Sequence, residues 1–234
     1  MKLTNFLQEF HPIITEYERC AFRDFSFPYE VTPHGYLREA EESLARMTQG
    51  GDRDAVANAK RGIDCQIEAV IETLGLQPGS GFPSRVAAIR KLGLVAPRIL
   101  EKINRLRNSI EHDFVNPSRE QAEMAVDTAL LFIELTHRVF RQMVLQCAIY
   151  DPTPKMEPWI NWGPNYLVFE LKGEAEEFEI KGRIEGRASI LQVVKRSDPE
   201  YVPLLRFFLA GDFAYSDRPD DKLIEQLRRD LNEI

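Results

Sequence analysis

The sequence has no long hydrophobic run, and its beginning lacks the pattern of a secretory leader. None of the apolar segments in its 234 residues reaches the length that crosses a bilayer. The first fourteen residues carry a single lysine and are interrupted by Gln8, Glu9 and Pro12. We therefore expect neither a membrane span nor a signal peptide.

Cysteine is scarce, and several familiar catalytic signatures are missing. The three cysteines are odd in number and far apart in the sequence, at Cys20, Cys65 and Cys147. Such spacing favours reduced thiols in a cytoplasmic protein over a disulfide framework or a zinc site. The patterns GxSxG, HExxH and GxGxxG do not occur, and Gly79-Ser80-Gly81 lacks the Lys and Ser/Thr of a phosphate-binding loop. We expect no metal and no cofactor.

The charge balance is acidic overall but basic in one stretch. Thirty-seven acidic residues against 30 basic ones give a formal net charge of −7, which argues against a protein that binds nucleic acid over its whole surface. Between Arg85 and Arg107, however, seven basic residues, among them Lys102 and Arg105, meet one acidic residue, Glu101. We expect this stretch to bind a polyanion locally and to lead it toward a site.

Hydrophobic periodicity predicts helices over most of the first 150 residues. Apolar residues recur there at spacings of three and four, the period of a helix with one buried face. Asn116 and Pro117 suit the N-cap and the first position of the last of these helices. The expected helices are 3–20, 36–48, 52–75, 84–91, 97–113 and 117–147.

The composition changes after Tyr150. A stretch rich in Pro and Trp, 151–164, is predicted to be a linker, and the alternating patterns that follow it are typical of strands. We expect strands at 165–172, 177–184 and 188–195, then helices at 199–209 and 220–232. The predicted fold is mainly α: an antiparallel helical bundle over 1–150, followed by a small α/β module over 165–234 with a short antiparallel sheet.

One segment contains side chains suited to acid/base catalysis. RNA cleavage without a metal needs a proton donor or acceptor that titrates near neutral pH, and a cation that holds the phosphate. His112 and Arg107 supply these two groups, and Asn108 lies one turn before His112 on the same helix face. The sequence therefore makes Arg107, Asn108 and His112 the candidate catalytic residues.

The same residues also have an ordinary structural explanation. Arg107 and Glu111 are four positions apart and form a typical surface ion pair, and a histidine near a helix C-terminus is favoured by the helix dipole. Arg107 also lies about 140° around the helix from His112. A long arginine side chain, an irregular helix end or a second copy of the helix is needed to bring both groups to one phosphate.

The segment Arg107-Asn108-Ser109-Ile110-Glu111-His112, with the Asn-Pro-Ser helix start and the Ala-rich helix after it, resembles the HEPN family. Its members are all-α domains with an Arg, a polar residue directly after it, and a His four to six positions further on. Here four residues separate Arg107 from His112. The helix at 58–75 resembles an earlier core helix of that fold, and the resemblance covers roughly residues 1–148.

The resemblance implies a metal-independent endoribonuclease that works as a homodimer, with two motif helices facing one cleft. Toxins, antiviral effectors and RNA processors of the family act in this way. His112 would then be the acid/base, Arg107 the phosphate clamp and Asn108 the orienting group. Asp64 or Glu68 would be the polar residue that some members add from the earlier helix.

Further residues and partners follow from the same reasoning. Substrate-binding candidates are Asp64, Lys102, Arg105 and Glu111, and the expected partners are RNA, a second copy of the chain and a regulatory protein. Some toxin members carry a modifiable Tyr two residues after the His, but this chain has Phe114 there. A non-catalytic module that binds a nucleotide or a protein, and a purely structural helical domain, remain the alternatives.

Overall fold

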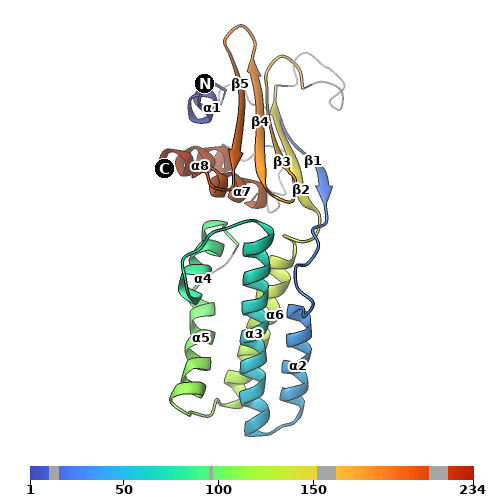
Figure 1. Ribbon diagram of the computed structural model, residues 1–234, viewed down its shortest axis with the longest axis vertical. Helices are drawn as coiled ribbons and strands as arrows, with labels where there is room; N and C mark the ends of the chain where they lie inside the picture. The colour runs from blue at the N-terminus through green and yellow to red at the C-terminus, as the bar shows by residue number, and fades with distance from the viewer. Residues whose placement is uncertain (11–15, 95–96, 152–161, 211–220) are drawn as a thin grey trace. The chain divides into compact units, whose positions relative to one another are not determined.

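The computed structural model describes residues 1–10, 16–94, 97–151, 162–210 and 221–234, which form two compact units (Figure 1). The helical unit comprises Phe25–Arg141, and the sheet unit combines Met1–Asp24 with Gln142–Ile234. The boundary expected near residue 150 is thus displaced, because the first 24 residues and residues 142–150 belong to the sheet unit. Most of the expected linker, residues 152–161, lies outside the described residues.

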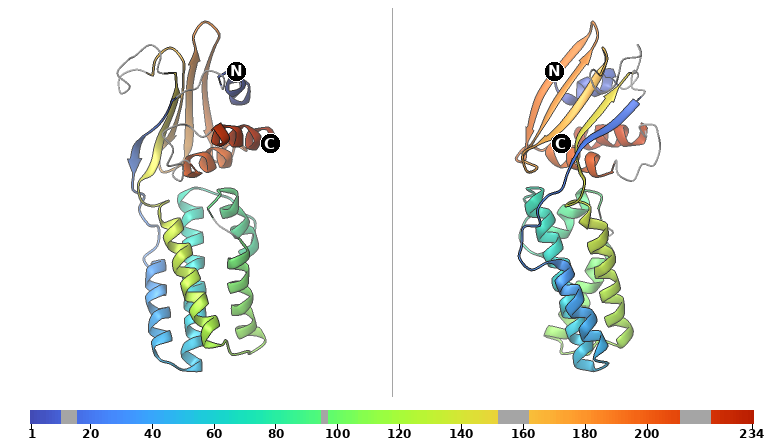
Figure 2. Two further views of the ribbon diagram at one scale, coloured as in Figure 1. Left: turned by 180° about the vertical axis from the view of Figure 1, so that it is seen from behind. Right: turned by 90° about the vertical axis from the view of Figure 1, so that its right-hand side faces the viewer.

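The helical unit is built around one long central helix. Its elements are α2 (Pro33–Ala45), α3 (Gln49–Thr73), α4 (Phe82–Lys91), α5 (Pro97–His112) and α6 (Arg119–His137). Helix α3 packs against each of the other four, and α2 also packs against α6 (Figure 2). The side chains of Val56, Ile63, Ile67 and Val70 on α3 are fully or almost fully buried, which places the core of this unit along that helix.

Side-chain caps set where three of these helices begin. The hydroxyls of Thr32 and Thr48 accept hydrogen bonds from backbone amides in the first turns of α2 and α3. Ser118 and Gln121 form a reciprocal capping box at the start of α6. The prediction that Asn116 is the cap was wrong; its side chain instead accepts a hydrogen bond from Arg53, at 3.1 Å.

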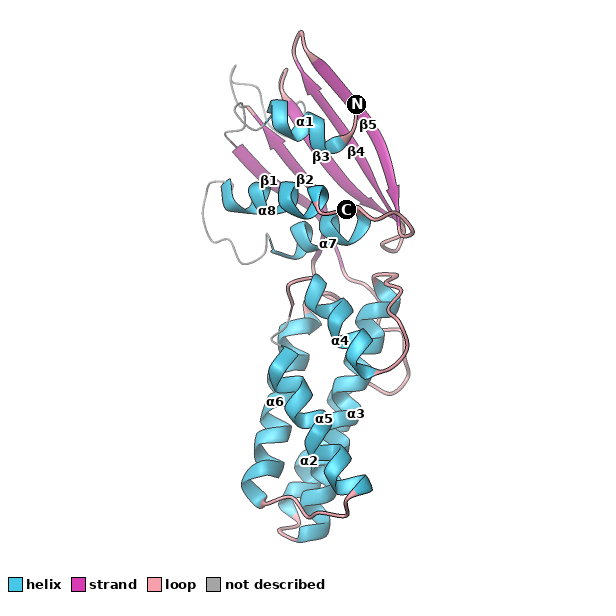
Figure 3. Cartoon of the chain, turned by 90° about the vertical axis from the view of Figure 1, so that its left-hand side faces the viewer, coloured by secondary structure: helices cyan, strands magenta, loops and turns pink. Residues whose placement is uncertain are grey.

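The described residues of the sheet unit form a five-stranded antiparallel meander with three helices. Its order in the chain is α1 (Leu3–Phe10), β1 (Glu16–Arg23), β2 (Met143–Tyr150), β3 (Tyr166–Lys172), β4 (Glu177–Ile184), β5 (Ala188–Lys195), α7 (Tyr201–Ala210) and α8 (Asp221–Asn232). The strands lie in the order β1-β2-β3-β4-β5. Figure 3 shows α1, α7 and α8 on one face of this sheet.

Buried and exposed side chains alternate along the strands, and the buried ones form the core of the sheet unit. On β4, Phe178 and Ile180 are buried beneath the helices, whereas Lys181 and Arg183 are exposed on the other face. The rings of Phe178 and Phe208 of α7 lie 4.9 Å apart between centroids. An apolar helix thus covers an alternating sheet, with the expected strands 177–184 and 188–195 confirmed residue for residue.

The predicted helix at 3–20 was wrong beyond Phe10. Residues 16–23 form β1, which pairs antiparallel with β2, so that Arg19 lies opposite Cys147. The apolar residues of α1 do repeat with a helical period, and Leu3, Phe6, Leu7 and Phe10 are buried. The strand partner of β1 lies more than a hundred residues away, and local periodicity does not report it.

The predicted helix at 117–147 was wrong in its last third. Helix α6 ends at His137, and residues 143–150 form β2 at the interior of the sheet. Gln142, immediately before β2, has a φ of 53°, which a continuing right-handed helix does not allow. Its backbone amide donates to Asp24 Oδ1 at 2.8 Å. Strand β2 is mostly apolar and has buried residues on both faces, so Met143 and Cys147 matched the helical spacing by coincidence.

The fold is therefore mixed: a helical part and a five-stranded antiparallel sheet that is larger than the predicted one. Within the described ranges, no helix has both the length and the apolar character to cross a bilayer.

Candidate functional site

Helix α5 carries the predicted catalytic residues and lies at one side of the helical unit. It packs against α3 and α4. Leu100 and Ile103 are buried, whereas Leu106 and Ile110, further along the same stripe, are only half-buried. The second half of α5 is thus less covered than the first, and this half holds the motif.

Arg107 turns toward its neighbours on α5. Its guanidinium forms an ion pair with Glu111, and Nη1 donates to Asn108 Oδ1 at 3.4 Å. Asn108 lies about 40° around the helix from His112, whereas the Cα of Arg107 lies about 140° from it. The long arginine side chain therefore carries its positive charge toward the face that Asn108 and His112 share.

His112 is the last residue of α5 and is exposed to solvent. In the part of the chain that the structure describes, its ring has no hydrogen-bonding partner. An exposed imidazole at a helix C-terminus is free to meet a substrate and lies at the end of the helix where a positive charge is stabilised. Among the described residues, no three His, Cys, Asp or Glu side chains converge to hold a metal ion.

A buried lysine lies beside this helix. Lys60 on α3 has a side chain that is 7% exposed, and its ammonium group binds Asp64 and lies 3.8 Å from the centroid of the Phe82 ring. Burial lowers the pKa of Lys60; the bond to Asp64 opposes this shift, and Arg85 and Arg107 add to it. Lys60 and Asp64 therefore form an ion pair on α3, and the charge of Arg107 on α5 acts on Lys60.

Some residues of the basic stretch are paired with carboxylates, and others are exposed. Arg85 forms an ion pair with Glu68 on α3, so this arginine holds α4 against α3 and is not free for RNA. Lys102 and Arg105 are exposed on α5, about 60° apart around the helix. Of the two, Arg105 lines the groove between α4 and α5, and Lys102 does not line that groove.

That groove, of about 280 Å³, runs between α4 and α5. Helix α4 contributes an apolar wall and Arg90, and α5 contributes polar side chains. The residues that line it are Phe82, Pro83, Val86, Ala87, Arg90, Glu101, Asn104 and Arg105. It mixes a hydrophobic surface with two cations, an amide and a carboxylate, which suits a ligand with an apolar ring and a negative charge.

A separate apolar surface lies on α6. Met124, Leu131 and Leu135 follow each other at spacings of seven and four, and they are 49%, 62% and 55% exposed. They form a stripe distinct from the buried one that packs on α3. Phe114 and Val115, directly after α5, are 86% and 52% exposed. Exposed apolar residues at helical spacing are typical of a surface that another chain covers.

Sequence reasoning found the residues of α5 but missed those that surround them. It did not find Lys60, although the spacing of Lys60 and Asp64 is that of an ion pair within a helix. Nor did it find the groove. Arg90 and Arg105 belong to different helices, and the hydrophobic pattern of one helix does not predict how it packs against another.

Comparisons of the chain with protein-family models, with curated proteins and with solved structures found no match.

Proposed function

We propose that the helical unit is a HEPN-like, metal-independent endoribonuclease whose active centre contains Arg107, Asn108 and His112. The observation that carries the proposal is the direction of the Arg107 side chain, whose Nη1 reaches Asn108 Oδ1. This contact directs a permanent cation to the helix face that also presents an exposed, unpaired imidazole. Those are the two groups that metal-free cleavage of RNA requires.

In the reaction, the ribose 2′-oxygen attacks the adjacent phosphorus as its proton leaves. The bond to the 5′-oxygen breaks, and that oxygen takes up a proton. The products are a 2′,3′-cyclic phosphate and a 5′-hydroxyl. His112 transfers one of these two protons, Arg107 neutralises the charge that grows on the phosphoryl oxygens, and Asn108 orients the phosphate.

A second copy of the chain supplies the other acid/base group in this proposal. One helix offers one histidine, whereas the reaction moves two protons. The exposed stripe of Met124, Leu131 and Leu135 on α6, and the exposed Phe114 two residues after His112, provide apolar surface for that copy. A toxin-like or defence role in the cytoplasm, with a regulatory protein partner, is the biological setting that the resemblance to the family implies.

A non-catalytic binding module is the second candidate, because Glu111 already pairs with the Arg107 guanidinium. In that case Arg107 stabilises helix α5 and does not bind a phosphate. The ion pair is half-exposed and joins residues four apart, so a phosphate competes with it at a cost of only about 0.5 kcal/mol.

The test is cleavage of end-labelled RNA of mixed sequence in EDTA by the whole purified chain. We expect the wild type to leave 2′,3′-cyclic phosphate ends and His112→Ala to be inactive. His34→Ala is the matched control, because it removes an exposed histidine from α2 and should retain activity. Glu111→Gln, which frees Arg107, should cleave at least as fast as the wild type. No cleavage by a folded wild type or by Glu111→Gln would leave the binding module as the better reading.

A further inference from the structure

The groove between α4 and α5 has two walls of different chemistry. On α4, Phe82, Pro83, Val86 and Ala87 present carbon, and the ammonium group of Lys60 lies over the Phe82 ring. On α5, Asn104 offers an amide that both donates and accepts hydrogen bonds, and Glu101 offers an acceptor. A flat heterocycle with polar edges fits between the two walls, because its faces pack on apolar side chains and its edges form hydrogen bonds with polar ones.

Two arginines at this groove are free to bind an anion. Arg90 and Arg105 are exposed, and within the described part of the chain neither forms an ion pair or a side-chain hydrogen bond. Other arginines of the helical unit, such as Arg85 and Arg119, are paired with carboxylates. A free guanidinium presents a planar fork of donors, and phosphate is the anion that this geometry fits well.

The α5 residues that line the groove share one side of that helix with Asn108 and His112 of the candidate active site. Glu101, Asn104, Arg105, Asn108 and His112 follow each other at spacings of three, one, three and four, which places them along one side of the helix. Arg105 and His112 are separated by two turns, about 10 Å along the axis. A chain with regularly spaced phosphates that lies in the groove would reach His112 with its next units.

We propose that this groove binds a nucleotide unit of single-stranded RNA, with the base against the α4 wall and the phosphate on Arg90 and Arg105. This inference rests on the proposed function for the identity of the polymer. It adds a substrate-binding site, two turns away from the cleavage residues, that holds the strand while His112 acts on a neighbouring phosphate. Stacking on an apolar or aromatic wall is tolerant of sequence, so the site favours unpaired RNA without strong base preference.

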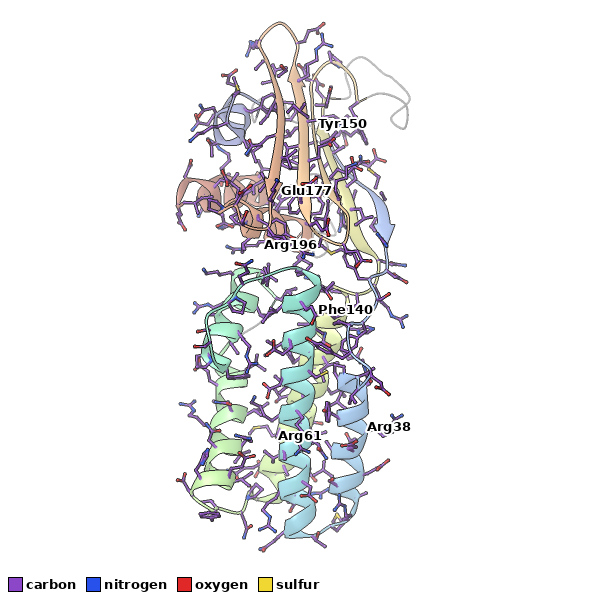
Figure 4. All side chains as sticks on the ribbon, in the orientation of Figure 1. Arg38, Arg61, Phe140, Tyr150, Glu177 and Arg196 are labelled. Atoms are coloured by element: carbon purple, nitrogen blue, oxygen red, sulfur yellow. The ribbon has the colours of Figure 1, made fainter. Side chains whose placement is uncertain are left out.

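The test measures binding separately from cleavage. A fluorescein-labelled, single-stranded 2′-O-methyl RNA of mixed sequence lacks the attacking hydroxyl, so its anisotropy reports affinity alone. We expect Arg90→Ala and Arg105→Ala each to weaken RNA binding about tenfold. Each change should also lower by about one the number of counterions released on binding, which the dependence of affinity on salt concentration measures. Arg38→Ala is the matched control: it removes an exposed arginine from α2, which lies across α3 from α4 and α5, and should bind as the wild type does (Figure 4).

Ala87→Trp tests the groove itself. Ala87 is exposed and lines the groove, so a large side chain there fills the space without removing a charge or disturbing the core. We expect it to weaken RNA binding about tenfold or more. Loss of affinity in the arginine variants with full affinity in Ala87→Trp would mean a diffuse charged surface and would overturn the proposal.

Further outcomes separate this proposal from the ribonuclease. Binding that depends on Arg90, Arg105 and Ala87 in a protein that cleaves nothing would support the groove and count against the proposed function. If the wild type cleaves RNA and all three variants cleave it equally fast, the result would support the proposed function and overturn the proposal that the groove binds RNA. Adenosine monophosphate that binds as tightly as the RNA would identify a free nucleotide as the occupant, and would also overturn the proposal.

Discussion

A buried hydrogen bond between α3 and α6 offers the sharpest test of how the helical unit is held together. Gln66 and Thr136 are both completely buried, and Gln66 Nε2 donates to Thr136 Oγ1 at 2.9 Å. The threonine hydroxyl also donates to the carbonyl of Phe132 at 2.7 Å, within α6. Gln66 Oε1 is buried and has no hydrogen-bonding partner in the described part of the chain.

Replacing one or the other partner of this bond with an apolar residue should change the free energy of unfolding by very different amounts. Thr136→Val keeps the shape of the side chain but leaves the Gln66 amide without an acceptor, which costs about 1–3 kcal/mol. Gln66→Leu removes both the amide donor and the unpaired oxygen, and the Thr136 hydroxyl keeps its bond to Phe132. We expect this change to lie within about 1 kcal/mol of neutral.

The double variant distinguishes a real bond from simple packing. With both polar groups gone, nothing buried is left unsatisfied, so Gln66→Leu/Thr136→Val should be more stable than Thr136→Val alone by about 1–2 kcal/mol. Urea unfolding followed by far-UV circular dichroism measures all four proteins. Equal costs for the two single variants, or strictly additive costs in the double variant, would refute the reasoning.

Two further changes test other parts of the chain. Burial and the hydrogen bond to Glu72 raise the pKa of Tyr29 to about 12, above its ordinary value near 10, so the protonated phenol is the form that the fold favours. The stability advantage of wild type over Tyr29→Phe should therefore be constant below pH 10 and shrink as the pH rises toward 12; a constant difference in urea midpoints over that range would contradict this. In the sheet unit, a Cβ on Gly182 would lie 2.8 Å from Phe6 Cζ and 2.9 Å from Ile190 Cγ2. Gly182→Ala should cost about 1–3 kcal/mol in thermal unfolding, while replacement of the exposed Ser189 of β5 in Ser189→Ala should change little. Equal stability of the two variants would count against this packing.

Local sequence signals were sufficient for the elements that are stabilised by their own neighbours in the chain. The apolar stripe of α3, the turns at glycine and proline around α4 and α5, and the alternation along β4 and β5 each predicted the observed element to within a few residues. Helical periodicity also placed Asn108 and His112 on one face of α5. These features depend on backbone geometry over a few residues, which a single sequence contains.

Only the tertiary structure decided the features that depend on distant partners. Residues 16–23 and 143–150 are strands because they pair with each other across more than a hundred residues. The largely apolar run 143–150 is equally compatible with a buried helix when its partner is unknown. The same holds at the candidate site. The burial of Lys60, the pairing of Arg85 with Glu68 and the groove that leaves Arg90 and Arg105 free all arise where α3, α4 and α5 pack together. Packing between helices depends on the facing side chains of two elements at once, which no pattern within one element records.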